Sequence, residues 1–374
     1  MVHGTADIAI VGSGIVGLAH AYMALRRGYR VVLFEREQFP VGASIRNFGL
    51  IWPIGQEPGI NLDHALRSRQ HWLEVARETG IWLNQNGSLH LAYHDDELAV
   101  LDEFESRFGN LGYDSTLISA EKAASCSGVV NKDGLKGALH SSTELTVNPR
   151  EAIRRISEWL QQELNLVTRY GSVVTAIDFP RVYTPTETWI ADKVIICNGA
   201  DFETLYPHVF NEKFTKCKLQ MMKAVTDHTF SIGPTLCAGL TLTHYKAFSQ
   251  CGSLDRVMER FDREDIRYSE NGIHVLLSQN NYGELIIGDT HHYGRTFEPF
   301  DSEALNDLVL EYLRSFTRLS RLRITERWNG VYPKVEGEAF LHLTPEPGVS
   351  VITGLGGAGM TLSFGIAEET IQRL

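Results

Sequence analysis

A β-α-β unit near the start of the chain constrains the fold more than any other feature of the sequence. Asp7–Val11 is a short apolar run without polar alternation, as expected for a strand buried on both faces of a parallel sheet. The glycine motif Gly12-Ser-Gly-Ile-Val-Gly17 follows directly, and an alanine-rich helical segment runs on to Leu25. A second buried strand, Arg30–Glu35, closes the unit. We therefore expect a doubly wound α/β domain that binds a dinucleotide.

The glycine spacing and one acid specify the ligand of this unit. Gly12, Gly14 and Gly17 let the backbone approach a pyrophosphate and place a helix N-terminus beneath its charge. Glu35 ends the second strand, 18 residues after Gly17, where its carboxylate can accept hydrogen bonds from ribose hydroxyls. The same carboxylate would repel a 2′-phosphate, which disfavours NADP.

Two further segments separate FAD from NAD. Val194–Ala200 reads as a buried strand that runs into a tight turn at Gly199, and Gly354–Thr361 is a second glycine-rich loop that opens a helix. The second loop can offer several backbone N–H groups to a phosphate or an electron-rich ring. Three such elements fit the long, extended FAD better than NAD.

Charge, hydropathy and cysteine spacing exclude several classes of protein. The formal net charge is −11 and no basic run occurs, so a nucleic-acid surface is not expected. No segment reaches the 18 or more apolar residues of a membrane span. The five cysteines form no C-x-x-C pair, and the first residues do not read as a signal peptide. We expect a cytoplasmic protein.

The order of the predicted elements indicates two interleaved domains. Asn148-Pro149 predicts the start of a helix to about Leu164, with Asn148 as its cap, and Ser302 is expected to cap a helix to Phe316. A strand is expected over 172–178, and 214–292 reads as alternating β-like segments. Doubly wound elements recur at both ends and in the middle of the chain. We expect an FAD-binding domain from 1–80, 145–212 and 325–374, and an antiparallel β-rich substrate domain from 81–144 and 213–324.

The motifs together resemble a known family. The N-terminal fingerprint with Glu35-Arg36, the loop Gly42–Gly49, the turn Cys197–Asp201 and the C-terminal glycine loop resemble the D-amino-acid oxidase superfamily, which includes glycine and sarcosine oxidases. The resemblance implies oxidation of a C–N bond by hydride transfer to flavin, with oxygen or another acceptor taking the electrons. It places Val174 by the adenine and other residues along the rest of the cofactor. The full cofactor-binding set expected is Gly12, Gly14, Gly17, Glu35, Arg36, Ser44, Arg46, Asn47, Val174, Gly199, Gly356, Gly357, Gly359, Met360 and Thr361.

Covalent flavin attachment in this family needs a suitably placed cysteine. No cysteine follows Cys251, so non-covalent FAD is expected.

One departure from the family pattern bears on the substrate. Relatives that bind a carboxylate commonly show G-[LV]-R-P, whose arginine forks onto the carboxylate, whereas this chain has Gly330-Val-Tyr-Pro333. Tyr332 replaces a bidentate cation with one hydroxyl. Arg327, five residues earlier on an extended segment, would face the other way, whereas Lys334 lies two residues on and is better directed.

A subgroup of the family is indicated by four segments taken together. Arg46–Gly49, Trp52–Gln56, Lys218–Met221 and Gly330–Pro333 resemble the flavoproteins proposed to act in bacterial aminophosphonate catabolism. A phosphonate suits the loss of the arginine, because separate point donors can hold a tetrahedral dianion. An anionic substrate also needs local cations to overcome the acidic net charge, and Lys334, Lys218 and Arg46 are the candidates.

The remaining site residues are aromatic or histidine side chains. Trp52 and Tyr245 are candidates for the pocket wall, and His291 of the pair His291-His292 is a candidate for contact with substrate. No metal site is expected, because no third ligand has a diagnostic spacing. The candidates for catalysis are Tyr332, Lys334, Trp52 and His291. Alignment of the substrate's C–H bond matters more than a dedicated base.

We interpret the sequence as an FAD-dependent oxidoreductase of a small, anionic, primary or secondary amine. An ordinary glycine, sarcosine or D-amino-acid oxidase is one alternative, if another cation binds the carboxylate. A flavin-binding assembly or sensor protein without turnover is an alternative of another class.

Overall fold

The computed structural model describes residues 2–227 and 230–374, and its first layer is a largely parallel sheet. Strand β1 (Gly4–Val11) lies parallel between β2 (Val31–Phe34) and β12 (Thr188–Ile196). The order β10-β11-β12-β1-β2-β9 ends in an antiparallel hairpin, and β20 and β19 attach beside β12. The other strands are β9 (Val167–Arg169), β10 (Ala176–Asp178), β11 (Arg181–Tyr183), β19 (Leu341–Glu346) and β20 (Val349–Thr353).

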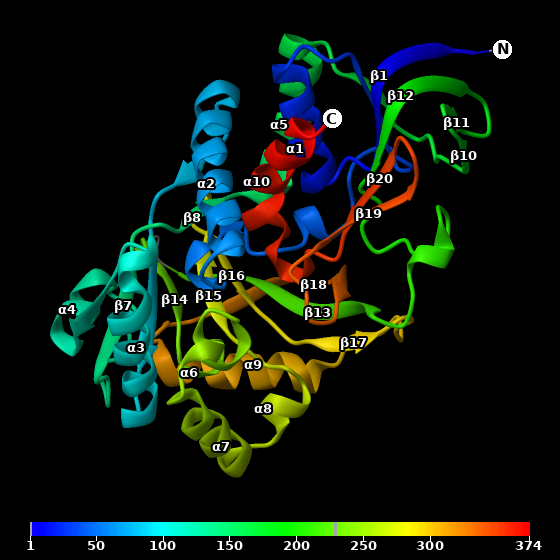
Figure 1. The fold of residues 1–374 in the computed structure, drawn as a ribbon. Helices are drawn as coiled ribbons and strands as arrows, with labels where there is room; N and C mark the ends of the chain where they lie inside the picture. The colour runs from blue at the N-terminus through cyan, green and yellow to red at the C-terminus, as the bar shows by residue number, and fades with distance from the viewer. Residues whose placement is uncertain (1, 228–229) are drawn as a thin grey trace.

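Four helices pack together against this sheet. They are α1 (Ile15–Arg26), α2 (Ile60–Thr79), α5 (Pro149–Leu164) and α10 (Gly359–Gln372), and Figure 1 shows α1, α5 and α10 side by side although the chain ends supply two of them. Their apolar faces share one core with Ile8 and Ile10, while Ala6 and Ala9 face a second core that includes Phe202 and Phe210. The strand is therefore buried on both faces, as its continuous apolar sequence predicts.

The second layer is a larger, almost wholly antiparallel sheet. Its order is β17-β13-β16-β15-β14-β5-β7-β6, with the long β18 paired to β13. Only β5 and β14 run parallel among the described pairs. Its strands are β5 (Ser88–Ala92), β6 (Ser115–Ser119), β7 (Gly137–Ser141), β13 (Phe214–Val225), β14 (Thr235–Cys237), β15 (Leu276–Gln279), β16 (Leu285–Gly288), β17 (His292–Gly294) and β18 (Arg323–Val335).

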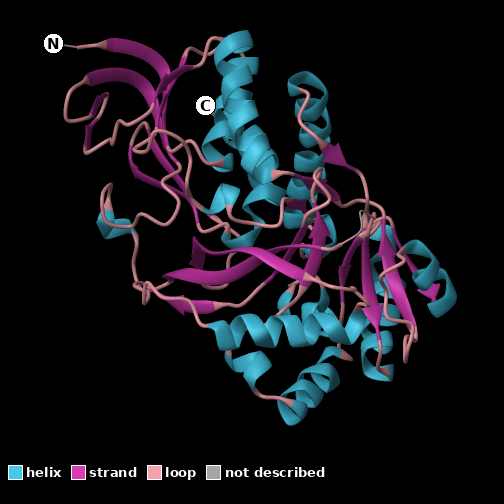
Figure 2. Ribbon diagram, turned by 180° about the vertical axis from the view of Figure 1, so that it is seen from behind, coloured by secondary structure: helices cyan, strands magenta, loops and turns pink. Residues whose placement is uncertain are grey.

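Helices cover the face of this sheet that lies away from the first layer (Figure 2). They are α3 (Asp95–Phe108), α4 (Ala120–Cys126), α6 (Gly239–His244), α7 (Leu254–Glu264), α8 (Arg267–Glu270) and α9 (Glu303–Phe316). A small sheet of β3 (Leu50–Ile51), β8 (Leu145–Val147) and β4 (Leu83–Asn84) lies between the two layers. The expected fold class, a dinucleotide-type α/β layer with an antiparallel second layer, is confirmed.

The expected domain boundaries stay a prediction. The boundary placed at residue 325 falls inside β18, which pairs with β13 over its whole length and so belongs to the second sheet. No described helix is long and apolar enough to cross a membrane.

Several local predictions are corrected by the structure. Helix α5 begins at Pro149 and ends at Leu164 as predicted, but the Asn148 side chain donates to Asn281 Oδ1 and makes no capping bond. Ser302 makes no side-chain cap either, and Gln220 of β13 hydrogen-bonds instead to its backbone N–H and C=O. The strand expected over 172–178 begins only at Ala176.

The segment predicted to be β-like over 214–292 contains three helices, α6 to α8. Helices α6 and α8 have only 6 and 4 residues, too few for a helical period. Helix α7 has 11 residues, and its buried Leu254, Val257 and Phe261 follow a helical spacing that the β-like interpretation missed.

Candidate active site

The first wall of the site is the glycine turn between β1 and α1. Gly12 has φ +102°, and a Cβ there would lie 2.3 Å from the Cys197 carbonyl oxygen. Gly14 and Gly12 line a cavity of about 740 Å³, whereas Gly17 does not. A Cβ on Gly17 would lie 1.9 Å from the Gly12 carbonyl oxygen. Gly17 therefore allows α1 to pack closely on its own turn, and Gly12 and Gly14 leave backbone facing the cavity.

Glu35 lies where the second strand ends, beside this turn. Its Oε2 accepts hydrogen bonds from the Ser13 backbone N–H at 3.0 Å and from the Ser13 hydroxyl at 2.8 Å. Glu35 and Arg36 both line the cavity, and Arg36 forms an ion pair with Asp201. The carboxylate is thus fixed at the mouth of the glycine turn, with accepting capacity left for ribose hydroxyls.

The loop after β2 closes over the start of α1. The Ser44 hydroxyl accepts a hydrogen bond from the Ile15 N–H at 2.9 Å, and the Asn47 side chain holds the loop through Ala43, Ser44 and Gly49. Arg46 donates to the Asn329 carbonyl oxygen of β18 at 3.1 Å. Ser44, Arg46 and Asn47 all line the cavity.

The C-terminal glycine loop forms the opposite wall. Gly356, Gly357, Gly359 and Met360 line the cavity, as do Val174 and Gly199 farther along it. Thr361 does not line it: this side chain is buried and accepts a hydrogen bond from the Trp52 N–H at 2.9 Å. Thr361 therefore holds the Trp52 segment against α10.

The residues present fit FAD. Glycine at positions 12, 14, 356 and 357 leaves backbone exposed along one continuous cavity, and Glu35 lies at the end where a ribose is expected. An apolar, largely preformed cavity of this size is typical of a cofactor site. Thirteen of the fifteen expected cofactor residues line it, the two others being Gly17 and Thr361.

The far end of the cavity reaches the second sheet. Tyr332 and His291 line it there, together with His244, Tyr245 and Asp289. Trp52 and Lys334 line a smaller adjoining cavity of about 170 Å³, which shares His244 and Tyr245 as walls. The structure therefore places the four candidate catalytic residues around two adjacent spaces that meet at His244 and Tyr245.

The register of β18 explains where its polar side chains lie. Tyr332 is buried opposite Cys217, whereas Arg327 is exposed and pairs with Glu303 at 3.1 Å, so Arg327 lies away from the cavity as expected. The Lys334 Nζ donates to the Tyr293 hydroxyl at 3.1 Å. Burial raises the pKa of Tyr332 well above its ordinary value and lowers the pKa of Lys334. The Tyr332 hydroxyl therefore stays protonated and able to donate at neutral pH.

Lys218 is not a free cation at the cavity. Its Nζ lies 2.8 Å from an Asp301 carboxylate oxygen and donates to the carbonyl oxygens of Glu298 and Phe300. It lines a separate surface pocket. The expectation that Lys218 offsets the acidic net charge for a bound substrate is therefore wrong, because Asp301 neutralises it.

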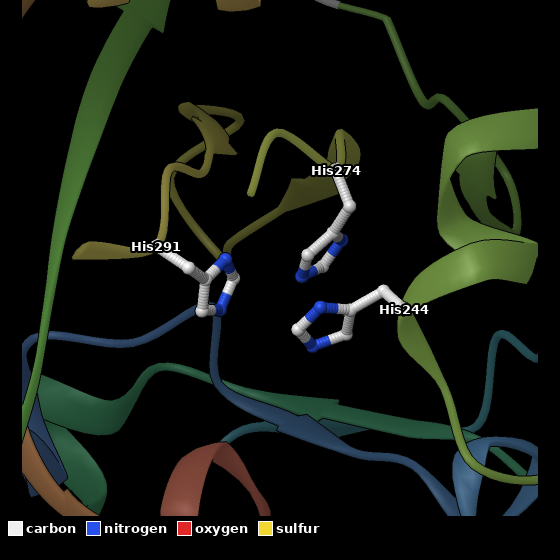
Figure 3. A group of neighbouring side chains, drawn as sticks. All are labelled: His244, His274 and His291. Carbon is white, nitrogen blue, oxygen red and sulfur yellow. The ribbon is translucent and has the colours of Figure 1, made fainter. Parts of the chain in front are cut away.

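Sequence reasoning missed two histidines that join His291. His244 is the last residue of α6, and His274 lies just before β15. The His244 ring centroid is 3.9 Å from that of His274 and 4.5 Å from that of His291 (Figure 3). The three lie 17 to 47 residues apart in the sequence, so no spacing motif reveals them.

The glycine turn is of the dinucleotide-binding type, and it opens into a cavity beneath an antiparallel sheet. This two-layer architecture is that of a flavoprotein oxidoreductase. The sequence profile of the family described as FAD dependent oxidoreductase (DAO) matches residues 7–373, and the chain belongs to this family. It is thus an FAD-dependent oxidoreductase.

Among curated proteins, the chain is 22% identical to an opine oxidase component of Agrobacterium tumefaciens over 361 residues, which cover 87% of this chain and 81% of the relative. It is 23% identical to γ-glutamylputrescine oxidoreductase of Escherichia coli, and the match covers 87% of this chain and 73% of that protein. It is 27% identical to the mitochondrial pyruvate dehydrogenase phosphatase regulatory subunit of Mus musculus, but the match covers only 38% of this chain and 16% of that protein.

The solved structure of glycine oxidase from Geobacillus kaustophilus has the same fold. The TM-score is 0.79 and the sequence identity is 20%. The superposition covers 99% of this chain and 95% of that chain. L-proline dehydrogenase from P. horikoshii gives a TM-score of 0.78, with 18% identity, 99% of this chain and 93% of that chain covered.

Proposed function

We propose that the protein oxidises the C–N bond of a small anionic amine, and specifically of an aminophosphonate, with FAD held non-covalently. The observation that carries the proposal is Tyr332, which occupies the cavity where the family resemblance expects a carboxylate-binding arginine. A single protonated hydroxyl cannot fork onto a planar carboxylate, but it can donate to one oxygen of a tetrahedral phosphonate.

The residues around Tyr332 supply further point donors. A Cβ placed on Gly357 would lie 3.7 Å from the Tyr332 hydroxyl, so this hydroxyl lies beside the C-terminal glycine loop. Lys334 follows two residues on, at the edge of the adjoining cavity. Together they offer a hydroxyl and an ammonium group to separate oxygens of one dianion.

FAD, when bound, supplies the acceptor for the hydride that leaves the carbon next to the substrate nitrogen. The imine that results is hydrolysed by water to a carbonyl compound and the free amine. The protein's own contribution is orientation, because Tyr332 and Lys334 fix the anionic end of the substrate while the buried walls exclude water.

Two relatives are named for amine substrates of a different kind, an opine and γ-glutamylputrescine. Their names support C–N bond oxidation as the reaction class and leave the anionic group to be tested.

The test is anaerobic mixing of the purified yellow protein with single amines, read by loss of flavin absorbance. We expect 2-aminoethylphosphonate or its N-methyl derivative to reduce the flavin. Reduction by glycine or sarcosine alone would refute the phosphonate, and no reduction by any amine would favour a binding role without turnover.

A matched pair of variants tests the role of Tyr332. Tyr332→Phe should raise the KM for the aminophosphonate about 10- to 100-fold, the effect of one hydrogen bond to a charged group, while FAD stays bound. Arg327→Ala changes the same strand on its outer face and should leave KM unaltered.

A further inference from the structure

Three histidines and one aspartate meet at the inner end of the main cavity. The cluster consists of His244, His274, His291 and Asp289, and all four line that cavity. Figure 3 shows the three rings turned toward one another from three separate segments of the chain. One ring nitrogen from each histidine lies within 4.8 Å of the corresponding atoms of the others.

Backbone pairing fixes the positions of these residues. The His274 N–H donates to the Asp289 carbonyl at 3.3 Å and the Asp289 N–H donates to the His274 carbonyl at 2.7 Å, which extends the pairing of β15 with β16. The His291 N–H donates to the Asn271 carbonyl at 2.9 Å. Backbone hydrogen bonds thus hold three of the four residues, His274 and Asp289 just beyond the ends of β15 and β16 and His291 against Asn271.

The side chains are polar, buried and incompletely paired. His274, Asp289 and His291 are 3%, 4% and 6% exposed. His274 Nε2 lies 3.0 Å from Asp289 Oδ1, whereas His274 Nδ1 has no hydrogen-bond partner within the described residues. A buried polar atom without a partner loses its hydration and gains nothing in return, so an unpaired imidazole nitrogen at the cavity wall indicates a ligand that satisfies it.

His90 provides an internal comparison. Both of its ring nitrogens are also unpaired, but the ring contacts the aromatic rings of Trp52 and Phe248 and forms no ion pair among the residues that the structure describes. The cluster at the cavity differs because it combines three imidazoles with a carboxylate.

We propose that these three histidines bind one divalent transition-metal ion, beside the Asp289 carboxyl group. Imidazole nitrogens favour ions such as Zn²⁺, Co²⁺ and Ni²⁺ over Mg²⁺.

The second nitrogen of His291 is already held by an acceptor. Its Nδ1 lies 2.8 Å from the Gly272 carbonyl oxygen, an arrangement that leaves a lone pair on Nε2. Closure of a tetrahedral site requires ligand nitrogens about 3.3 Å apart, so the three rings move together by about 1–1.5 Å when the ion binds.

Three protein nitrogens leave an open position on such an ion. Resting on the proposed function, we infer that this position binds the anionic group of the substrate, in place of the missing arginine. The ion would then act as an electrostatic anchor for substrate.

The experiment uses the purified FAD-loaded protein, dialysed against a chelator and then titrated with Zn²⁺ by calorimetry, with Mg²⁺ as the comparison. We expect about one equivalent of Zn²⁺ per chain and no binding of Mg²⁺. His274→Gln and His244→Gln should each weaken Zn²⁺ binding at least tenfold. His292→Gln, adjacent to His291 and exposed, is the control and should bind Zn²⁺ as the unaltered protein does.

The FAD spectrum and melting temperature of each variant establish that it is folded. Failure of the folded, FAD-loaded protein to bind Zn²⁺, Co²⁺ or Ni²⁺ would overturn the metal site, as would binding that His274→Gln and His244→Gln leave unaltered.

The anchoring role has a separate readout. Removal of the metal should raise the KM for 2-aminoethylphosphonate at least tenfold while FAD stays bound, and an unaltered KM would overturn that role. If no amine is oxidised with or without metal, the proposed function fails while the binding titration still decides the metal site.

Discussion

Gly17→Ala tests whether FAD binding requires the close packing of α1 on the glycine turn that precedes it. The new Cβ would lie 1.9 Å from the Gly12 carbonyl oxygen, whereas ordinary contacts begin at 3.4 Å. The start of α1 must therefore move by about 1.5 Å. Hydrogen bonds to a phosphate hold only over about 2.7–3.2 Å, so a shift of this size removes those made by the helix N-terminus.

The expected effect on the fold is small compared with the effect on FAD. Overpacking of this kind costs about 1–3 kcal/mol, which in a chain of 374 residues lowers the melting temperature of the FAD-free protein by about 1–4 °C. Loss of even one charge-assisted hydrogen bond weakens FAD binding about tenfold or more.

The assay is fluorescence titration of the FAD-free protein, with Gly128→Ala as the control. A Cβ on Gly128 meets no atom within 4 Å, so this variant should match the unaltered protein in both FAD affinity and melting temperature. A folded Gly17→Ala protein that binds FAD within threefold of normal would refute the reasoning.

Three further predictions concern acids and one buried cation. Glu35→Gln should weaken FAD about tenfold or more in the same titration, because a neutral amide accepts ribose hydrogen bonds less well. Hydrogen bonds from Ser253 lower the pKa of Glu103 to about 2. A lowered carboxyl pKa stabilises the folded protein at pH values above 4.5, the pKa of the unfolded chain, and this stabilisation is lost as the pH falls toward 2. The difference in melting temperature between the unaltered protein and Glu103→Gln should therefore shrink from pH 7 to pH 3. A difference that stays constant over this range would contradict the prediction. Arg260→Met should destabilise the protein by about 3–5 kcal/mol in urea unfolding, because Glu97 is left buried without its cation, and a loss below 1 kcal/mol would contradict it.

The cofactor half of the site was predictable because its signals are local. The turn Gly12–Gly17, its following helix and Glu35 lie within one β-α-β unit, and backbone geometry requires glycine there. The same holds for Pro149, whose fixed φ and missing N–H suit the first turn of α5. Local sequence also predicted a capping hydrogen bond from the Ser302 side chain, but this bond is absent. The Ser302 backbone N–H instead donates to Gln220, which is distant in the sequence.

The substrate half was only partly predictable because it is assembled from distant segments. Tyr332 was found through its departure from a family motif, and His291 through its neighbour in sequence. His244 lies on a helix too short to show a period, and His274 precedes a strand, so neither carries a local signal. Thr361 was assigned to the cofactor from its place in a glycine loop, but it lies behind that loop and binds the Trp52 backbone.

The charges at the inner cavity link the substrate and the metal proposals. Within residues 2–227 and 230–374, Lys334 and Arg46 donate to the Tyr293 hydroxyl and the Asn329 carbonyl oxygen and form no ion pair, so their charges are available to an anion. A dication on the three histidines would add to their attraction for the anion, because the histidines line the same cavity. Removal of the metal should therefore weaken the binding of an anionic amine far more than the binding of an uncharged-headed amine of the same length.

The comparison is 2-aminoethylphosphonate against ethanolamine, each titrated by calorimetry against protein whose FAD has first been reduced with dithionite, so that no turnover occurs. We expect removal of the metal by a chelator to weaken the binding of 2-aminoethylphosphonate at least tenfold and the binding of ethanolamine less than threefold. Only the phosphonate group is attracted by the positive charge of the ion. The neutral-headed ligand is the control for any general change in the cavity. Equal weakening of the two ligands would refute the electrostatic link, since it would mean that the ion shapes the cavity and does not attract the substrate's charge.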